Sequence, residues 1–517
     1  MSANIRTIDI EPSARGRAGR WWALAALVVS GLVIGLDSTV LITALPTLSS
    51  KLGATTSDLQ WIAAAYTLTL GGLLLPGGVL GDRYGRKRLL LVGLVIFGIS
   101  SVIASQATTA AELIGMRALM GVGAALILPL SLSILPSLFT PEERPRAISA
   151  TAAGAFLGLP LGPLVAGWLL THYAWGSVFL INAPVVVLAL LGVWFLVPEN
   201  KDPNPRPFDW FGGLLAVVGV TALVYGVIEQ PIHGWTDPRV LGGIIGGALV
   251  LAAFTGWDLQ HPSPFVDLRN FRSRGFTWAT MAFVITGFGL FGVMFILTPY
   301  IQIVLGNDAQ ATGIKLLPLI GGVIVGAGIG NVLAARLGAR VGISAGLSLT
   351  AAALVGFSQI GANTSFGPVA AALAVIGIGI GIALPTTLDI ILGTLPPSQT
   401  GAGSALTRAL QQIAATFGVA ILGSILNNVY QAQITPHLAA LPAAARDVAL
   451  GSIAGAHAVA AHLPPAVGAG VVRAANEAYT RGMGEVMLIS ASLVLATAVA
   501  IAIFLPTRIT PIEAGTV

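Results

Sequence analysis

Two charged side chains stand inside long apolar stretches of the chain. Asp37 lies within the apolar run at 21–45, and Arg117 lies within the run at 111–136. A charge in such a segment is costly in lipid unless it is paired or neutralised, so residues of this kind are expected to carry function. A carboxylate in contact with a guanidinium is held by their attraction, and a proton taken up by the acid removes that attraction. Arg117 is therefore the natural cationic partner for Asp37.

The spacing along the chain places both residues at a similar depth. Asp37 lies nine residues before Pro46, where its run ends, and Arg117 lies six or seven residues after its own run begins. At 1.5 Å of rise per helical residue, both are expected roughly 10–14 Å from the same surface. We therefore predict contact between them. A permanent ion pair that only locks two helices together is the alternative interpretation.

The composition indicates which elements carry these residues. Of 517 residues, 55% are hydrophobic and 9% are charged, whereas soluble proteins are about a quarter charged. Apolar runs near the length of a membrane-spanning helix recur throughout. We predict an all-α membrane protein with fourteen transmembrane helices near 21–45, 58–80, 89–106, 111–136, 147–171, 176–197, 211–230, 239–258, 276–300, 312–335, 341–361, 367–392, 402–427 and 483–505.

The first run is too long for a signal peptide, so we expect it to be retained as the first span. The chain has no cysteine, which removes disulfides and thiolate metal sites from consideration.

The distribution of basic residues predicts the orientation. Cytoplasmic loops are enriched in lysine and arginine, and an even number of spans puts both termini on one side. With both termini inside, most of the 26 basic residues fall on the cytoplasmic side. Two, Arg117 and Arg408, lie within spans, and six fall outside: Lys51, Arg239, Lys315, Arg446, Arg473 and Arg481. The net charge of +5 then reflects membrane topology and not a nucleic-acid surface.

The loop after the second span repeats later in the chain. It reads Gly78-Val-Leu-Gly-Asp-Arg-Tyr-Gly-Arg-Lys87, and the stretch 331–340 keeps the positions of Arg83, Gly85 and Lys87 but has Ala335 in place of Asp82. Repeated halves are typical of secondary transporters, which bind substrate between them. We therefore expect two pseudo-symmetric six-helix bundles, 21–197 and 276–505, separated by linkers at 198–210 and 259–275 and by two extra helices within 211–258.

One segment departs from the short loops elsewhere. The outer segment 428–482 is Ala-rich and weakly amphipathic and contains three histidines, His437, His457 and His462. Helices lying over the outer mouth and a loosely ordered loop are both compatible with its sequence. Three scattered histidines indicate surface residues and not a metal site, and no metal is expected.

Several motifs together carry a resemblance. The loop Gly78–Lys87 has the pattern G-x-x-x-D-R-x-G-R-K. Further patterns start at Leu36 (L-D-x-T-V), Arg117 (R-x-x-x-G-x-G-A-A) and Gly158 (G-x-x-x-G-P-x-x-G-G, with Ala166 for one glycine), and Asn182 lies in a matching F-x-x-N-x-P. These resemble the signatures of the major facilitator superfamily, and specifically of its fourteen-span drug:proton antiporter family (multidrug-resistance and quaternary-ammonium-type exporters). The sharp motifs cover residues 36–184.

The resemblance implies roles for three groups of residues. Asp37 and Arg117 would couple substrate to protons. A conformational latch between the halves would hold the cytoplasmic side shut, and an antiporter motif would distinguish exporters from importers. The latch comprises Gly78, Asp82, Arg83, Gly85 and Arg86, and the antiporter motif comprises Gly158, Gly162, Pro163 and Gly167. The alternatives are positive-inside anchoring for the loop and small-residue helix packing for the motif.

Weaker candidates could line a substrate cavity. They are polar or aromatic residues within or near spans: Trp61, Tyr66, Asn182, Tyr300, Gln302, Asp389, Arg408, Gln411 and Gln412. The sequence departs from the cation-exporting pattern W-x-x-D-x-Y, because Ala64 stands at the acidic position. With Asp37 as the deep carboxylate, neutral or singly charged lipophilic substrates are favoured.

The expected function is proton-driven export of lipophilic small molecules by alternating access across the plasma membrane (the bacterial inner membrane). A lipid or lipid-like substrate, and proton symport for nutrient uptake, are the alternatives. The sequence contains no phosphate-binding G-x-x-x-x-G-K-[ST] loop and no catalytic constellation. We therefore expect no cofactor and no enzymatic activity. The expected partners are a lipophilic small molecule, protons and the bilayer around a monomer, with no nucleic acid.

Overall fold

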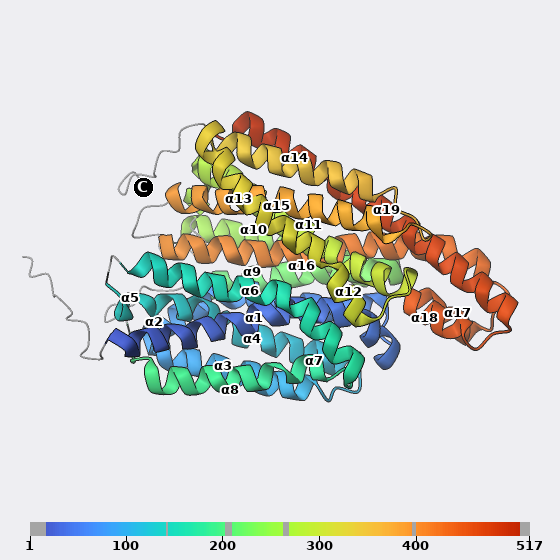
Figure 1. Cartoon of the computed structure of the whole chain (residues 1–517), viewed down its shortest axis with the longest axis horizontal. Coiled ribbons are helices and arrows are strands. Elements are labelled where there is room, and N and C mark those ends of the chain that lie inside the picture. The colour runs from blue at the N-terminus through green and yellow to red at the C-terminus, as the bar shows by residue number, and fades with distance from the viewer. Residues whose placement is uncertain (1–16, 141–142, 202–208, 262–267, 395–399, 507–517) are drawn as a thin grey trace, which may run out of the picture.

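The computed structural model describes residues 17–140, 143–201, 209–261, 268–394 and 400–506, and within them the chain is helical throughout. Thirteen helical segments of the described residues are long and apolar enough to cross a membrane. Helix α6 (Arg144–His172) coincides with the remaining predicted span, the fifth. The long helices run side by side in Figure 1, which confirms the predicted all-helical membrane fold.

The N-terminal half is a bundle of six long helices. Its helix α1 packs against α6 and α8, α2 packs against α4, and α3 packs against α4 and α8. The bounds are α1 (Arg17–Leu52), α2 (Thr56–Tyr84), α3 (Arg86–Ala104), α4 (Ala110–Ser133), α5 (Leu135–Leu138), α6, α7 (Ser177–Leu180) and α8 (Asn182–Leu196).

The C-terminal half repeats this arrangement. Helix α11 packs against α16 and α19, α13 against α15, and α14 against α15 and α19. The bounds are α11 (Arg274–Pro299) with the π-helical turn η2 (Tyr300–Val304), α12 (Ala309–Lys315), α13 (Leu317–Leu337), α14 (Ala339–Phe357), α15 (Phe366–Thr394), α16 (Thr400–Ile434) and α19 (Pro465–Phe504). The pairing follows that of the N-terminal half helix by helix, so the internal repeat is structural.

The repeated loop shows the same symmetry at the residue level. Gly85 between α2 and α3 has φ +113°, and Gly338 between α13 and α14 has φ +87°, a backbone region that favours glycine. Lys87 donates from Nζ to the Trp194 carbonyl at the end of α8. Its counterpart Arg340 donates to the Ala502 carbonyl at the end of α19. Each loop is thus tied to the last helix of its own half.

The two extra helices form a hairpin beside the junction of the halves. Helix α9 (Trp210–His233) packs against α10 (Pro238–Gln260) and also contacts α2 and α16. Trp61 of α2 donates to the Glu229 carboxylate of α9 at 3.3 Å, and Asn428 of α16 donates to Gln230 at 2.8 Å. The hairpin is therefore bonded to both halves. A short 3₁₀ turn, η1 (Leu268–Arg272), precedes α11.

The two ends of the molecule differ. We call the end that carries Arg20, Arg86, Arg88 and Arg340, where α1 starts and α19 finishes, the basic end. The opposite end, on the right in Figure 1, carries the segment between α16 and α19 and is called the cap end.

Most of that segment is helical. It extends α16 and α19 and adds η3 (Thr435–Leu438) and the cap helices α17 (Ala443–Gly451) and α18 (Ile453–Ala460). Of the two interpretations of 428–482, the helical one is confirmed.

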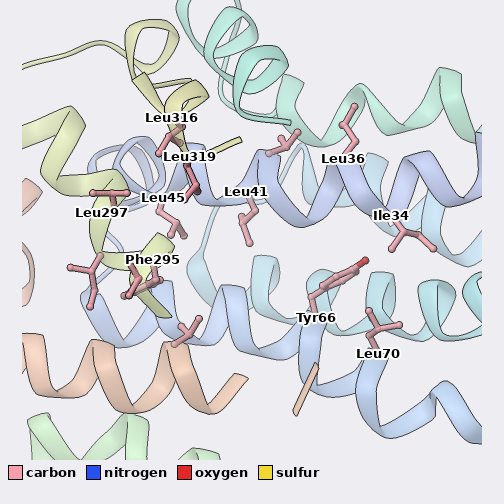
Figure 2. Packing of buried hydrophobic residues seen from close by; sticks show 14 of the residues in the cluster. Ile34, Leu36, Leu41, Leu45, Tyr66, Leu70, Phe295, Leu297, Leu316 and Leu319 are labelled. Atoms are coloured by element: carbon pink, nitrogen blue, oxygen red, sulfur yellow. The ribbon is translucent and has the colours of Figure 1, made fainter. Parts of the chain in front are cut away.

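The halves meet mainly toward the cap end. Figure 2 shows Phe295 and Leu297 of α11 beside Leu45 of α1, and all three belong to one buried apolar cluster. Among the described residues, the hydrogen bond between the halves that lies closest to the basic end joins Thr67 and Thr416, at 2.7 Å. The molecule is therefore closed at the cap end.

Candidate functional site

Four helices of the N-terminal half converge on Asp37. Arg117 of α4 places Nη1 2.6 Å from Asp37 Oδ2, and Asn182, the first residue of α8, donates to Oδ1 at 3.1 Å. Ser101 of α3 accepts a hydrogen bond from Asn182 at 3.0 Å and donates to the Phe179 carbonyl at 2.8 Å. Each residue is satisfied by the next, as a buried polar network requires.

The predicted contact between Asp37 and Arg117 is thus present, and both side chains are 2% exposed. Arg117 is held by two further contacts. Its Nε donates to the Ile62 carbonyl of α2 at 3.3 Å, and its guanidinium carbon lies 4.2 Å from the centre of the Tyr66 ring. A desolvated cation over an aromatic face is stabilised by about 2 kcal/mol. These contacts attach Arg117 to α2 in addition to its ion pair with α1.

Glycines bring α6 against the helix that carries Asp37. A Cβ atom on Gly158 would lie 2.4 Å from the Leu36 backbone nitrogen, and one on Gly162 would lie 1.9 Å from Thr39 Oγ1. These contacts flank Asp37 on both sides, so the motif residues set the position of α1. Gly121 acts similarly in α4, because a Cβ there would lie 2.6 Å from the Tyr66 carbonyl oxygen.

The other two positions of the antiporter motif lie at the junction of the halves. A Cβ on Gly167 would lie 2.6 Å from the Ala309 carbonyl oxygen of α12, and one on Gly313 would lie 2.3 Å from the Pro163 carbonyl oxygen. Helices α6 and α12 therefore touch backbone to backbone at the cap end. The motif therefore also lets the N-terminal half contact the C-terminal half at this end.

The loop between α2 and α3 is bonded within its own half. Asp82 accepts from Arg86 Nε at 2.8 Å, and Arg86 Nη1 donates to the Ser133 carbonyl at the end of α4 at 2.9 Å. Asp82 lies in the last turn of α2, not at a helix start. Arg83 is exposed, with its guanidinium carbon 5.9 Å from the Tyr84 ring centre, and Gly78 faces Pro129 of α4.

The contacts of this loop among the described residues lie within the N-terminal half, and its role as a latch between the halves stays a prediction.

Sequence reasoning missed the partner of this loop. The Glu199 carboxylate accepts from the backbone nitrogens of Lys87 at 3.1 Å and Arg88 at 3.2 Å, at the start of α3. A carboxylate there satisfies otherwise unpaired amides and the helix dipole. A Cβ on Gly85 would meet Glu199 Oε1 at 2.8 Å. Glu199 stands in the polar linker, and no local pattern in the sequence connects it to α3.

The other residues predicted to line a substrate cavity lie in different parts of the structure. Tyr66 and Asn182 belong to the cluster around Asp37. Gln302 donates to the Thr43 carbonyl at 2.7 Å and joins the halves at the cap end. Tyr300 is buried and donates to the Gly361 carbonyl at 3.1 Å within the C-terminal half. Trp61, expected to line the cavity between the halves, instead bonds to Glu229 of the extra hairpin, because its face of α2 is covered by α9.

Polar residues of α15 and α16 lie closer to the basic end. Gln412 packs against Gly71 of α2, where an added Cβ would lie 3.1 Å from its side chain. Gln411 packs against Gly287 of α11. Arg408 lies one helical turn before Gln411 and Gln412 on the same side of α16 and is half-buried. Asp389 of α15 is exposed. The face of α16 that carries Arg408, Gln411 and Gln412 therefore lies between α2 and α11.

No group of three or more histidine, cysteine, aspartate or glutamate side chains arranged to hold a metal ion occurs in the described ranges. The three histidines of the cap are apart: His457 bonds to Asn476 at 2.8 Å, and His437 and His462 each bond to a carbonyl one turn earlier.

Comparisons with known proteins agree with this arrangement. The family model of the Major Facilitator Superfamily matches residues 27–419. A multidrug efflux pump of Mycolicibacterium smegmatis is 33% identical over 490 residues, which cover 93% of this chain and 96% of the relative. A tetracenomycin C resistance and export protein of Streptomyces glaucescens is 32% identical, covering 80% and 77%.

A methyl viologen resistance protein of Salmonella typhimurium is 31% identical, covering 93% and 97%. Among solved structures, a bacterial homologue of the human lysosomal transporter Spinster superposes with a TM-score of 0.66 at 16% identity, covering 96% of this chain and 100% of that one. A D-xylose–proton symporter gives 0.63 at 14% identity, covering 95% and 99%. At these identities, the solved structures support the fold.

Proposed function

Because this chain belongs to the Major Facilitator Superfamily, we propose that it is a proton-coupled antiporter that exports lipophilic small molecules by alternating access. The observation that supports this most directly is the sealed Asp37–Arg117 pair, 2.6 Å apart and 2% exposed on each side. An acid buried in a membrane helix is costly even when it is paired, and residues of this kind usually mark proton or substrate pathways. The efflux and resistance proteins of similar sequence support the direction of transport.

The geometry links a proton on Asp37 to the junction of the halves. Protonation removes the charge that holds Arg117 and Asn182, and so loosens α1 from α4 and α8. Thr43, six residues further along α1, accepts the hydrogen bond of Gln302 from the opposite half. A shift of α1 would therefore reach the seam directly. Export would follow when proton uptake and substrate binding favour different positions of α1.

The basic end would face the cytoplasm under the positive-inside rule. Both termini would then be cytoplasmic, in the plasma membrane of a bacterium, and the cap would lie outside. In this orientation the structure is closed to the exterior. The proton gradient would supply the energy without a cofactor, and a monomer would contain the complete path because both halves belong to one chain.

The substrates would be neutral or singly charged. The charge of Asp37 is matched by Arg117, and Ala64 is fully buried and packs with Val220 and Val224 of α9. An acid at position 64 would therefore face the extra hairpin in this structure. Little unmatched negative charge remains for a doubly charged cation.

The test uses full-length protein in proteoliposomes with a substrate first identified by screening the wild type. Substrate added to wild-type protein should move protons in the opposite direction to itself. Asp37→Asn should abolish this proton movement, because a side-chain amide does not bind and release a proton near neutral pH. The control Asp447→Asn, which removes an exposed cap carboxylate, should behave as wild type. Undiminished proton movement in Asp37→Asn would overturn the coupling role, and movement in the same direction as substrate would indicate symport.

A further inference from the structure

Three polar side chains on one face of α16 have no bonded partner within the described part of the chain. Arg408, Gln411 and Gln412 are each half-buried, and none of their side chains forms a hydrogen bond or an ion pair there. Asp389 of the adjacent helix α15 is exposed and makes no ion pair with Arg408. Half-buried polar groups of this kind need water or a ligand to complete their hydrogen bonds.

Packing fixes the two glutamines on either side of Arg408. A Cβ on Gly71 of α2 would lie 3.1 Å from Gln412 Cβ, and one on Gly287 of α11 would lie 2.8 Å from Gln411 Cγ. These contacts involve the carbon stems of the glutamines, so their amide groups remain available. The guanidinium therefore has one amide on the side of α2 and one on the side of α11.

The opposite side of α16 is covered by the extra hairpin. Ser424 donates to the Val227 carbonyl of α9 at 2.9 Å, and Asn428 donates to Gln230 of the same helix. At about 100° per residue, these two positions lie roughly 160° and 200° around α16 from Arg408. Arg408 therefore points away from the hairpin, between one helix of each half and toward the interior of the molecule.

The three residues lie between the basic end and the place where the halves join. Arg408 is eight residues after Thr400, where α16 starts, which corresponds to roughly 12 Å of helix. The Thr67–Thr416 hydrogen bond between the halves lies about two turns further along α16. The exposed part of the guanidinium is therefore on the basic-end side of the closure.

The charges inside the spans are unequal. Asp37 and Arg117 neutralise each other at 2.6 Å, whereas Arg408 has no acidic partner among the described residues. A cation in a membrane-spanning helix is costly without a counter-ion. One negative charge beside Arg408 would offset that cost, whereas a positively charged molecule would be repelled.

We propose that Arg408, Gln411 and Gln412 bind the carboxylate of a lipophilic molecule that carries this one negative charge. The guanidinium donates two parallel hydrogen bonds to the carboxylate oxygens, and the glutamine amides donate to the lone pairs that remain. Lipophilic monoanions are then the preferred substrates of the transporter. Their export rests on the proposed function, whereas their binding does not.

Equilibrium binding to full-length protein in phosphatidylcholine nanodiscs, without a proton gradient, tests the charge preference. The tritiated probes have naphthalene, biphenyl and dodecyl skeletons, each as a carboxylate, a primary amide and an amine. On at least one skeleton, wild-type protein should bind the carboxylate roughly tenfold more tightly than the amide, because hydrogen bonds between charged groups are the stronger ones. Equal binding of carboxylate and amide on every skeleton, or a preference for the amine, would overturn the proposal.

Variants of α16 test the residues. Arg408→Gln should remove the preference for the carboxylate, Arg408→Lys should keep part of it, and Arg408→Glu should transfer it to the amine. The control Arg272→Gln removes a charge from an exposed position at the same end and should bind as wild type. An unchanged preference in Arg408→Gln would mean that the arginine only anchors α16, and the site would be wrong. Should Arg408→Glu fail to fold, the other two variants provide the comparison.

The glutamines have their own comparison. Gln411→Leu and Gln412→Leu should each weaken binding of the carboxylate by roughly two- to tenfold, the range expected for one hydrogen bond. Carboxylate binding that neither substitution weakens would remove the amides from the site.

An anionic lipid headgroup is the other source of a negative charge. Native mass spectrometry of protein from nanodiscs that also contain phosphatidylglycerol distinguishes the two. We expect the same number of bound phosphatidylglycerol molecules in wild type, Arg408→Gln and Arg272→Gln. A lipid lost only in Arg408→Gln would assign the guanidinium to the membrane and overturn the substrate role.

Transport separates this inference from the proposed function. In proteoliposomes, wild-type protein should exchange the preferred carboxylate for protons, and Asp37→Asn should bind that carboxylate without exchanging it. Carboxylate binding without exchange in wild-type protein would contradict proton antiport and leave the binding site intact. Proton exchange with neutral or cationic substrates that the carboxylate does not inhibit would support antiport and overturn the substrate class inferred from Arg408.

Discussion

At the scale of single residues, the Asp37 cluster shows how a buried ion pair is made tolerable. Arg117 has one carboxylate, one carbonyl and one aromatic ring as partners, and Asp37 has a second donor in Asn182. Desolvating both charges is expensive, and the surrounding bonds offset that cost. In the proposed function, proton exchange would require the cluster to open, because both side chains are 2% exposed in this state.

The Tyr66 ring provides a prediction at this scale. Tyr66→Leu removes the face beneath the guanidinium and should destabilise the protein by about 2–3 kcal/mol, from lost packing and lost cation–π attraction. Tyr66→Phe keeps the ring and should cost less than about 1 kcal/mol. Thermal unfolding of the purified variants measures the difference. Equal destabilisation by the two substitutions would show that the hydroxyl, and not the ring face, matters.

At the scale of elements, small residues decide which helices touch. The antiporter motif of α6 makes two different helix contacts. Gly158 and Gly162 set the distance to α1 around Asp37, whereas Gly167 sets the distance to α12 of the other half. Helix α6 is thus in contact with both the buried acid and the seam. Association of helices in lipid depends on such close packing more than on burial of apolar surface.

A substitution at Gly158 tests this dependence. The new Cβ of Gly158→Ala would meet backbone atoms of Gly35 and Leu36, and backbone cannot rotate away as a side chain can. We expect a loss of about 1–3 kcal/mol in stability from overpacking, together with slower transport. The control Gly115→Ala on α4 has no atom within 4 Å of the new Cβ and should be close to neutral. Equal unfolding midpoints for the two variants would contradict the packing role.

At the scale of the whole molecule, the halves are joined by bonds gathered toward the cap end. Beyond Gln302–Thr43, they include Ser49 to Ser452 at 3.0 Å and Thr56 to the Gly451 carbonyl at 3.0 Å. Both of the latter tie the cap segment of the C-terminal half to the turn between α1 and α2. Opening at this end would break them, so we expect the cap to move during the transport cycle.

Cross-linking tests this movement without background, because the chain has no cysteine of its own. Ser49→Cys combined with Ser452→Cys places two sulfurs within reach of a disulfide. Oxidation should stop transport, and a reductant should restore it. Each single variant, treated alike, should keep its activity under both conditions. Full transport by the oxidised double variant, with the bond confirmed by mass spectrometry, would show that the cap end stays closed during transport.

The amino-acid sequence by itself determined the helices, the internal repeat and the charged residues that lie deep within the spans. Long apolar runs can satisfy their backbone in lipid only as helices, and a charge at depth needs a partner at the same depth, which identified Asp37 and Arg117. The length of the apolar runs was sufficient for the first inference, and helix rise along the chain was sufficient for the second.

Only the tertiary structure decided which faces meet. The contact of Asn182 with Asp37, the capping of α3 by Glu199 and the covering of Trp61 by α9 join residues far apart in the chain, and no local pattern encodes them. Helix packing in lipid is set by the fit of particular surfaces. The sequence pattern of one helix does not specify which other helix it fits.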